Sequence, residues 1–377
     1  MILFGFLCSF VWLASVLLFL SGTYFSCASL KRASLRKKRL QSAAPISILK
    51  PVCGLEEGLE RNLLSFFQLE YAKYELIFTI AHPTDPARPI IEKLMQRFPN
   101  VQSKLHIMES KVGKNPKINN IYWGYKTSQH SLVLISDSNI RVPRNYLSEM
   151  VGLLEPGVGV VTSTISGVGA TTFGATLESI YLNTYLCRWI HLSNKLGNPI
   201  VLGKSMLFRK SDLESCGDIE ALANVIAEDY ATSAFMRKKG LKVAVMNAPV
   251  NQYLGAFSFK AFWLRHIRWG RIRKCCEYPL FLAEPFVSAS GAGVCGALAF
   301  WAWTGEAFWV FLLTHLSVWF LIEFFLATRQ ESTRSWKVLP CWLALEVVTM
   351  PIWISAFFGN TILWRGNRLR LYAGGRL

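Results

Sequence analysis

The first 30 residues carry no charged side chain. Within them, MILFGFLCSFVWLASVLLFLSGTYF exceeds the roughly 20 apolar residues that a helix needs to cross a bilayer core. A cleaved signal peptide would start with basic residues and have a shorter apolar segment. Here the basic residues follow the apolar run, at Lys31, Arg32 and 36–39, which places this end of the segment in the cytoplasm. We therefore expect a permanent membrane anchor with its N-terminus outside.

The C-terminal third is also apolar. Residues 284–305 and 307–328 are expected to form two spans joined by a tight turn. A third stretch, 338–364, contains Glu346 and Pro351, so it could be kinked, re-entrant or interfacial. Two spans return the chain to the cytoplasm in agreement with the basic residues that follow, whereas a full third span would leave the basic tail outside.

The charge balance points to an acidic partner. The formal net charge is +17 and the apolar share is 52%. An excess of this size favours nucleic acid, anionic lipid headgroups or a phosphate-bearing substrate. The long apolar runs favour a lipid bilayer over nucleic acid.

The middle of the chain alternates apolar runs with amphipathic segments. We expect strands at 46–52, 74–81, 104–108 and 132–136, and helices at 59–69, 87–98 and 116–128. Continuous apolar strands separated by helices of this length predict βαβ units and a mostly parallel sheet covered on both faces.

Two of the five aspartates follow predicted strands. Asp137 comes directly after LVLIS, and Asp85 lies a few residues past LIFTIA. Ligands of open α/β sheets bind outside the carboxyl ends of the strands, so both residues are candidates for a site. The alternative is an ordinary turn residue, because aspartate is favoured in turns by its own side-chain hydrogen bonds.

Two further segments carry candidate chemistry. Residues 224–240 fit a helix with Glu228 and Asp229 near its first turns. The segment 262–274 mixes tryptophan, phenylalanine and arginine at helical spacing, which is also typical of a basic amphipathic helix on a membrane surface.

These segments resemble the ceramide glucosyltransferases and their bacterial relatives, which are membrane-bound inverting glycosyltransferases with a GT-A catalytic domain. The resemblance covers nearly the whole chain. It is carried, in this order, by SILKPVCGLEEGLERNLLSFFQLEYAKYEL, KVGKNPKINNIYWGY, SDSNIRV, AEDY and RHIRW. It implies an α/β GT-A fold with one N-terminal and two to three C-terminal transmembrane helices.

The implied organisation has six parts. They are an N-terminal transmembrane anchor (1–28), a basic juxtamembrane linker (29–44), a GT-A domain (45–250), an amphipathic interfacial helix with the RHIRW motif (251–280), a C-terminal transmembrane region (281–364) and a basic tail (365–377).

The resemblance also implies a metal-assisted reaction of a UDP-sugar. Asp137 matches the metal-binding aspartate of the family, and Mg²⁺ or Mn²⁺ would neutralise the leaving diphosphate. The usual Asp-x-Asp pattern is Asp137-Ser138-Asn139 here, so the second ligand would be the carbonyl oxygen of Asn139. This departure leaves the identity of the metal open.

Other matches imply nucleotide contacts. Asp85 matches an aspartate expected to contact the base or ribose of the nucleotide. Lys117 matches a lysine near the nucleotide, and its alternative is a solvated residue at the start of a helix.

The catalytic roles come from the last two motifs. Asp229 matches the general base that removes the proton of the acceptor hydroxyl, whereas Glu228 could simply favour the helix dipole. Arg265, Arg268 and Trp269 match the Gln/Arg-x-x-Arg-Trp motif and would share one helix face. Guanidinium groups suit phosphate recognition, and Trp269 could stack near acceptor or sugar.

The implied activity is transfer of a hexose, with glucose as first choice, from a UDP-sugar to a membrane lipid, with ceramide as first choice. Animal members carry a His-Pro-type element where this chain has Leu186, Cys187 and Arg188, and His191 does not align with it. N-acetylglucosamine transfer to a hopanoid polyol such as bacteriohopanetetrol is therefore the alternative, and a bacterial inner membrane is favoured over the Golgi. A processive polysaccharide synthase would need more spans, and a non-catalytic scaffold would not need the intact aspartates.

Overall fold

The computed structural model describes residues 1–35, 44–108, 110–330, 338–364 and 366–377. The predicted basic residues at 36–39 lie outside this set. The chain divides into two units. The sheet unit comprises Lys31–Ser166, Ser193–Gly255 and Arg376–Leu377, and the helical unit comprises Met1–Leu30, Gly167–Leu192 and Ala256–Gly375. Each unit encloses its own hydrophobic core.

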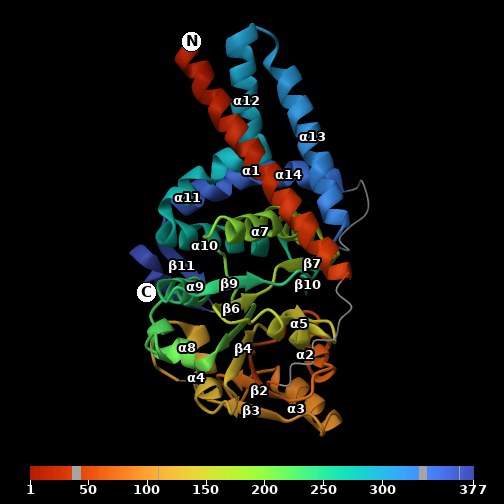
Figure 1. Ribbon diagram of the computed structural model, residues 1–377, viewed down its shortest axis with the longest axis vertical. Helices are drawn as coiled ribbons and strands as arrows, with labels where there is room; N and C mark the ends of the chain where they lie inside the picture. The colour runs from red at the N-terminus through yellow and green to blue at the C-terminus, as the bar shows by residue number, and fades with distance from the viewer. Residues whose placement is uncertain (36–43, 109, 331–337, 365) are drawn as a thin grey trace. The chain divides into compact units, whose positions relative to one another are not determined.

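A seven-stranded sheet with the order β3-β2-β1-β4-β8-β6-β9 forms the centre of the sheet unit (Figure 1). Its strands are β1 (Ile46–Pro51), β2 (Tyr74–Ile80), β3 (Ser103–Ile107), β4 (Leu132–Ser136), β6 (Val158–Thr162), β8 (Ser205–Arg209) and β9 (Lys242–Val245). The four strands predicted from the sequence are confirmed. They pair in parallel, with Ile46 of β1 opposite both Tyr74 of β2 and Leu132 of β4.

The sheet is mixed rather than uniformly parallel. Strand β8 runs antiparallel to β4 and β6, and β6 and β9 are parallel. A short strand, β5 (Ile140–Arg141), pairs antiparallel with β10 (Val250–Gly255). The helices of this unit are α2 (Leu59–Phe67), α3 (Arg88–Arg97), α4 (Pro116–Lys126), α5 (Tyr146–Val151), α8 (Lys210–Glu214), η2 (Ile219–Leu222) and α9 (Glu228–Lys238).

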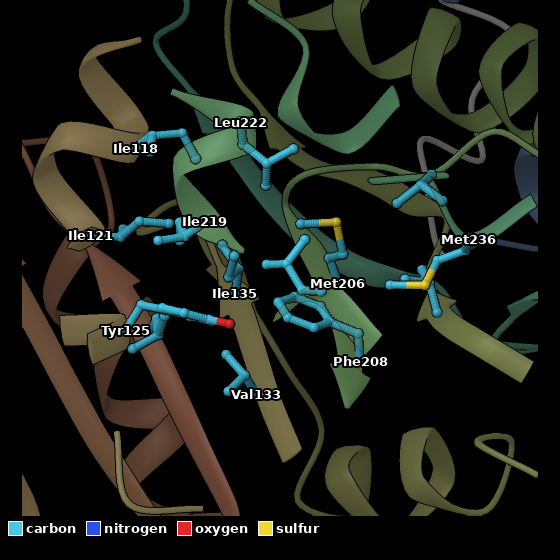
Figure 2. Close-up of a cluster of buried hydrophobic side chains, with 14 of the residues drawn as sticks. Ile118, Ile121, Tyr125, Val133, Ile135, Met206, Phe208, Ile219, Leu222 and Met236 are labelled. Carbon is cyan, nitrogen blue, oxygen red and sulfur yellow. The ribbon is translucent and has the colours of Figure 1, made fainter. Parts of the chain in front are cut away.

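The core of the sheet unit fixes α4 against the sheet. Ile118, Ile121 and Tyr125 lie on one face of α4 at helical spacing and are fully buried. Figure 2 shows them facing the buried side chains of β4 and β8, beside η2. Each fully buried side chain of this size contributes roughly 1.5–3 kcal/mol relative to exposure. This packing holds the first turn of α4 in place at the edge of the sheet.

The helical unit contains the apolar segments. Its elements are α6 (Phe173–Tyr181), η1 (Leu182–Leu186), α10 (Phe259–Cys276), α11 (Tyr278–Ala283), η3 (Glu284–Val287), α12 (Ala289–Thr304), α13 (Phe308–Thr328), α14 (Val338–Phe357), β11 (Thr361–Trp364), β12 (Asn367–Arg370) and η4 (Ala373–Gly375). Three elements cross the boundary between the units, namely α1 (Ile2–Leu35), β7 (Ile165–Ala170) and α7 (Cys187–Lys195).

Among the residues that the structure describes, three helices are long and apolar enough to cross a membrane. They are Ile2–Ala33 within α1, together with α13 and α14. Ala289–Thr304 is long and apolar enough only when it is taken together with Tyr278–Val287. The two helices are bent by 66° relative to one another. In Figure 1, α12 and α13 lie side by side and are joined by a short connection.

The segment expected as a span over 284–305 is divided between η3 and α12. The helix is broken before Ala289, because the hydroxyl group of Ser288 accepts a hydrogen bond from Gly291 N and starts a new helix. The turn predicted at 305–306 is confirmed, with Gly305 at φ 71° ending α12. The third apolar stretch is one helix, α14, with Pro351 inside it, and an antiparallel hairpin of β11 and β12 follows.

Candidate active site

Two of the predicted site residues follow neighbouring parallel strands. Asp137 comes directly after β4, and Asp85 lies five residues past the end of β2. Because β2, β1 and β4 are parallel, their carboxyl ends lie at the same edge of the sheet. Both aspartates therefore lie at the edge where the sequence analysis expected them.

Lys117 connects this edge to two carboxylates. Asn115 caps α4 by accepting hydrogen bonds from the backbone N–H groups of Lys117 and Ile118, which fixes Lys117 in the first turn. The Lys117 Nζ atom lies 2.9 Å from Asp137 Oδ1 and 2.6 Å from Glu228 Oε1. Burial opposes the charged form, but the two carboxylates outweigh it and raise the pKa of Lys117 above its usual range. The side chain is a buried ammonium ion rather than a solvated helix-start residue.

Gly203 brings the backbone into this cluster. Lys117 Nζ donates a hydrogen bond to Gly203 O at 2.8 Å, and Gly203 N donates to Asp229 Oδ2 at 2.8 Å. A Cβ atom at position 203 would lie 2.7 Å from Glu228 Oε1. It would also lie 3.2 Å from Asp229 Oδ2, so a larger residue here would force the Glu228 side chain to move.

Asp229 lies at the start of α9 beside the ion pair. Its Oδ1 atom accepts a hydrogen bond from Tyr230 N at 2.8 Å. Burial, and then the negative charge of Glu228, raise the pKa of Asp229 to about 6, against the opposing effect of Lys117. At neutral pH the group is therefore a carboxylate with more than ordinary basicity, as a general base requires.

Asp85 has different surroundings. Both carboxylate oxygens accept hydrogen bonds from Gly54 N, at 3.1 and 3.0 Å, and Oδ1 also accepts from Ala87 N at 2.9 Å. These contacts are those of a turn residue that holds the loop after β1. The structure thus gathers Lys117, Asp137 and Asp229 in one cluster, and places Asp85 at the same edge of the sheet but in contact with other backbone groups.

Asn139 lies near a further cation. Its Oδ1 atom accepts a hydrogen bond from Lys204 Nζ at 3.3 Å, and Lys204 also donates to Gln252 Oε1 at 2.6 Å. Lys204 lies in the turn before β8, directly after Gly203. No local sequence pattern indicates its place in the site.

Lys50 was also missed. This lysine is fully buried in β1, and its Nζ donates to the backbone oxygen of Asp137 at 2.5 Å and to Ser136 Oγ at 3.3 Å. Burial is the largest effect and lowers the pKa of Lys50 to about 7. A single lysine inside the apolar strand ISILKPV was the available signal, because buried lysines are rare unless they have a partner.

The side-chain oxygens at this edge of the sheet suit a divalent metal ion that is also bound by the phosphates of a substrate. The described residues contain no group of three or more histidine, cysteine, aspartate or glutamate side chains that could hold a metal ion. Asp137 offers one partly exposed carboxylate, and Asn139 offers a carbonyl oxygen. Mg²⁺ is commonly held by one or two carboxylates plus substrate phosphates and water, so these residues fit such an ion.

The RHIRW motif lies on α10 in the helical unit. Arg265 Nη1 lies 2.7 Å from Glu178 Oε1, and His266 Nε2 lies 2.8 Å from Glu178 Oε2. Glu178, in α6, is fully buried; burial would raise its pKa, but Arg265 and His266 outweigh this and hold it at about 2. The ring of Trp269 lies 5.3 Å from that of His266 and 6.1 Å from that of Tyr181. Arg265 is therefore held by an internal ion pair whose acid, Glu178, the sequence analysis did not identify.

Comparison with known proteins finds ceramide glucosyltransferases among the similar sequences. The sequence is 29% identical over 338 residues to ceramide glucosyltransferase 1 of Caenorhabditis elegans, covering 88% of this chain and 72% of that protein. It is 25% identical over 417 residues to the ceramide glucosyltransferase of Komagataella phaffii, covering 86% and 82%.

Among solved structures, a mannosyltransferase from Pyrobaculum calidifontis in complex with GDP-mannose and Mn²⁺ aligns with a TM-score of 0.53 and 15% identity, over 92% of this chain and 97% of that one. This likeness confirms the predicted GT-A fold. The sequence model of glycosyl transferase family 21 matches residues 13–377. Because this match covers nearly its whole length, the chain belongs to glycosyl transferase family 21.

Proposed function

We propose that the protein is an inverting, membrane-bound enzyme that transfers glucose from UDP-glucose to a hydroxyl group of ceramide. The observation that carries the proposal is the cluster of Asp137, Lys117 and Asp229 at the carboxyl edge of the sheet. The choice of substrates is supported by the names of the relatives from C. elegans and K. phaffii.

Asp229 acts as the general base. It takes the proton of the acceptor hydroxyl while the oxygen attacks the anomeric carbon and the bond from that carbon to the diphosphate breaks. A positioned carboxylate typically contributes about 10²- to 10⁴-fold to the rate. Attack on the face opposite the leaving UDP inverts the configuration of the sugar.

Lys117 supplies positive charge for the diphosphate. Asp137 and Asn139 would hold Mg²⁺ or Mn²⁺, which when bound neutralises the leaving diphosphate as a Lewis acid. On chemical grounds Arg268 and Trp269 are proposed to bind phosphate and to stack on a sugar or acceptor. Asp85 is proposed to contact the nucleotide.

The proposed orientation places the sheet unit in the cytoplasm. Its support is the pair of basic residues, Lys31 and Arg32, in the last turns of α1.

The test is a matrix of donors and lipids. The purified protein in detergent is incubated with UDP-glucose, UDP-galactose or UDP-N-acetylglucosamine and with ceramide or bacteriohopanetetrol, and labelled products are separated by thin-layer chromatography. We expect glucosylceramide with a β linkage by NMR, because UDP-glucose is an α-glycoside. An α-linked product would refute inversion. If product forms only from bacteriohopanetetrol and UDP-N-acetylglucosamine, then both the proposed donor and the proposed acceptor are wrong. A polymeric product would indicate a processive synthase.

A further inference from the structure

The helical unit contains a cavity of about 70 Å³. Its walls come from η1 and α7, from α10, from the bend between η3 and α12, and from α13 and α14. At the ~10–15 Å³ that one water needs, this volume has room for roughly five water-sized groups. The cavity therefore has the size of a small polar headgroup.

Two interruptions of regular helix meet at this cavity. Thr184 and Tyr185 line it from η1, which is a π-helix between α6 and α7. Ser288 and Ala289 line it at the 66° bend where α12 begins. Single-turn π-helices occur frequently at functional sites, and irregular backbone in membrane proteins is tolerated where it is buried in protein or lines a cavity.

Arg188 lines the cavity and has a buried donor without a hydrogen-bond partner among the described residues. Arg188 is 6% exposed, and its Nη2 lies 2.5 Å from Glu323 Oε1. The second carboxylate oxygen of Glu323 accepts a hydrogen bond from Trp342 Nε1 at 2.7 Å. The second terminal nitrogen of Arg188, Nη1, has no hydrogen-bond partner among the residues that the structure describes. Unpaired buried donors are costly, and Arg188 is one of the residues that line the cavity, so a ligand oxygen that reaches Nη1 would satisfy this donor.

An acceptor is present as well. Glu346 lines the cavity from α14, and its Oε2 atom accepts a hydrogen bond from Ser290 N at 2.8 Å, in the first turn of α12. Carboxylates in membrane-spanning helices are rare and mark functional sites. With Arg188 as donor and Glu346 as acceptor, the cavity can pair both with a carbonyl oxygen and with a hydroxyl group.

The charges around the cavity select the class of ligand. Its lining includes two arginines, Arg188 and Arg273, and three glutamates, Glu284, Glu323 and Glu346. Arg188 is paired with Glu323, and Arg273 is paired with Glu284. Positive charge is not in excess, so an anionic headgroup such as a phosphate would meet carboxylates without a free counter-charge. A neutral headgroup with hydroxyl and amide groups fits.

The cavity shares a helix with the RHIRW motif. Phe262, His266 and Gly270 of α10 line it, and the ring of Tyr181, another lining residue, lies 4.4 Å from the ring of His266. We infer that this cavity binds the headgroup of a neutral, hydroxylated membrane lipid and, resting on the proposed function, that this lipid is the acceptor.

The test fills the cavity and compares it with a matched position. Thr349 lines the cavity on α14 and donates a hydrogen bond to Leu345 O. Thr314 makes the same i−4 contact with Val310 O on an exposed face of α13. We expect Thr349→Met to raise KM for C6-ceramide at least tenfold and to leave KM for UDP-glucose unchanged. Thr314→Met should change neither constant.

Binding without turnover separates this inference from the proposed function. A photoreactive C6-ceramide is crosslinked to the full-length Asp229→Asn protein, with and without Thr349→Met, and labelled peptides are located by mass spectrometry. Labelling at the cavity that Thr349→Met abolishes supports the inference, even if wild-type protein transfers no glucose to ceramide. If the wild-type protein transfers glucose to ceramide normally, and Thr349→Met keeps both the labelling and the KM for ceramide within twofold of wild type, the inference about the cavity is wrong. The proposed function would still hold.

Two further arms address folding and charge. Tyr185→Phe removes one hydroxyl group without filling space, and we expect a roughly three- to tenfold rise in KM for ceramide with an unchanged Tm. Ceramide 1-phosphate should compete with the photoreactive probe at least tenfold more weakly than ceramide does. Equal competition by the two lipids would overturn the assignment to a neutral headgroup.

Discussion

The raised pKa of Asp229 makes the pH dependence of transfer a direct test of its role as base. Protonated Asp229 cannot accept the proton of the acceptor, so activity should fall as pH decreases through the pKa of about 6. For one group with this pKa, the ionised fraction falls from about 0.9 at pH 7 to about 0.1 at pH 5. We therefore expect kcat/KM for ceramide to fall about tenfold over this range. With the ordinary value of 3.8, the same change would be only about 6%.

The assay is the initial rate of glucosylceramide formation at low ceramide and saturating UDP-glucose and Mn²⁺. Each sample is incubated at pH 5 and then assayed again at pH 7, which separates titration from unfolding. Glu228→Gln is the diagnostic variant, because it removes a negative charge that raises the pKa of Asp229 and should move the acid limb to lower pH. A wild-type kcat/KM that varies less than twofold between pH 5 and pH 7 would refute the reasoning.

Four other outcomes are expected. Asp229→Asn should lower kcat by about 10²- to 10⁴-fold and leave UDP-glucose binding unchanged by calorimetry; equal turnover would eliminate this base. A chelator should abolish transfer and Mn²⁺ should restore it, whereas full activity in EDTA would exclude the metal assigned to Asp137. Gly203→Ala should reduce kcat at least tenfold, because its Cβ would lie 2.7 Å from Glu228 Oε1; a wild-type rate would show that the loop can move away. Glu178→Gln should lower Tm in detergent, since breaking a buried ion pair costs about 3–5 kcal/mol, and an unchanged Tm would contradict the importance of that pair.

Local patterns in the sequence predicted the first strands of the sheet and the helices between them. The apolar runs of β1 to β4 and the helices between them were found because side-chain periodicity is set within a few residues. Asp85 and Asp137 were placed at the carboxyl edge by the same reasoning. The membrane helices were predicted from length and hydropathy. The break before Ala289 was not, because it depends on the N-cap formed by Ser288, which hydropathy does not detect.

The contacts that give these residues their chemistry could not be predicted in this way. The direction of β8, the approach of Gly203 to Asp229, and the burial of Lys50 beneath Asp137 depend on how distant segments cross. The ion pair between Glu178 and Arg265 joins two helices far apart in the sequence. No periodicity links such positions.

The sequence by itself determined that this protein has an α/β body, apolar spans and carboxylates at strand ends, because each follows from neighbouring residues. Only the tertiary structure decided that Lys117 lies between Asp137 and Glu228, and that a headgroup-sized cavity forms where a π-helix meets a broken helix. The physical reason is that charge pairing and cavities depend on distances across the fold, which the order of residues along the chain does not specify.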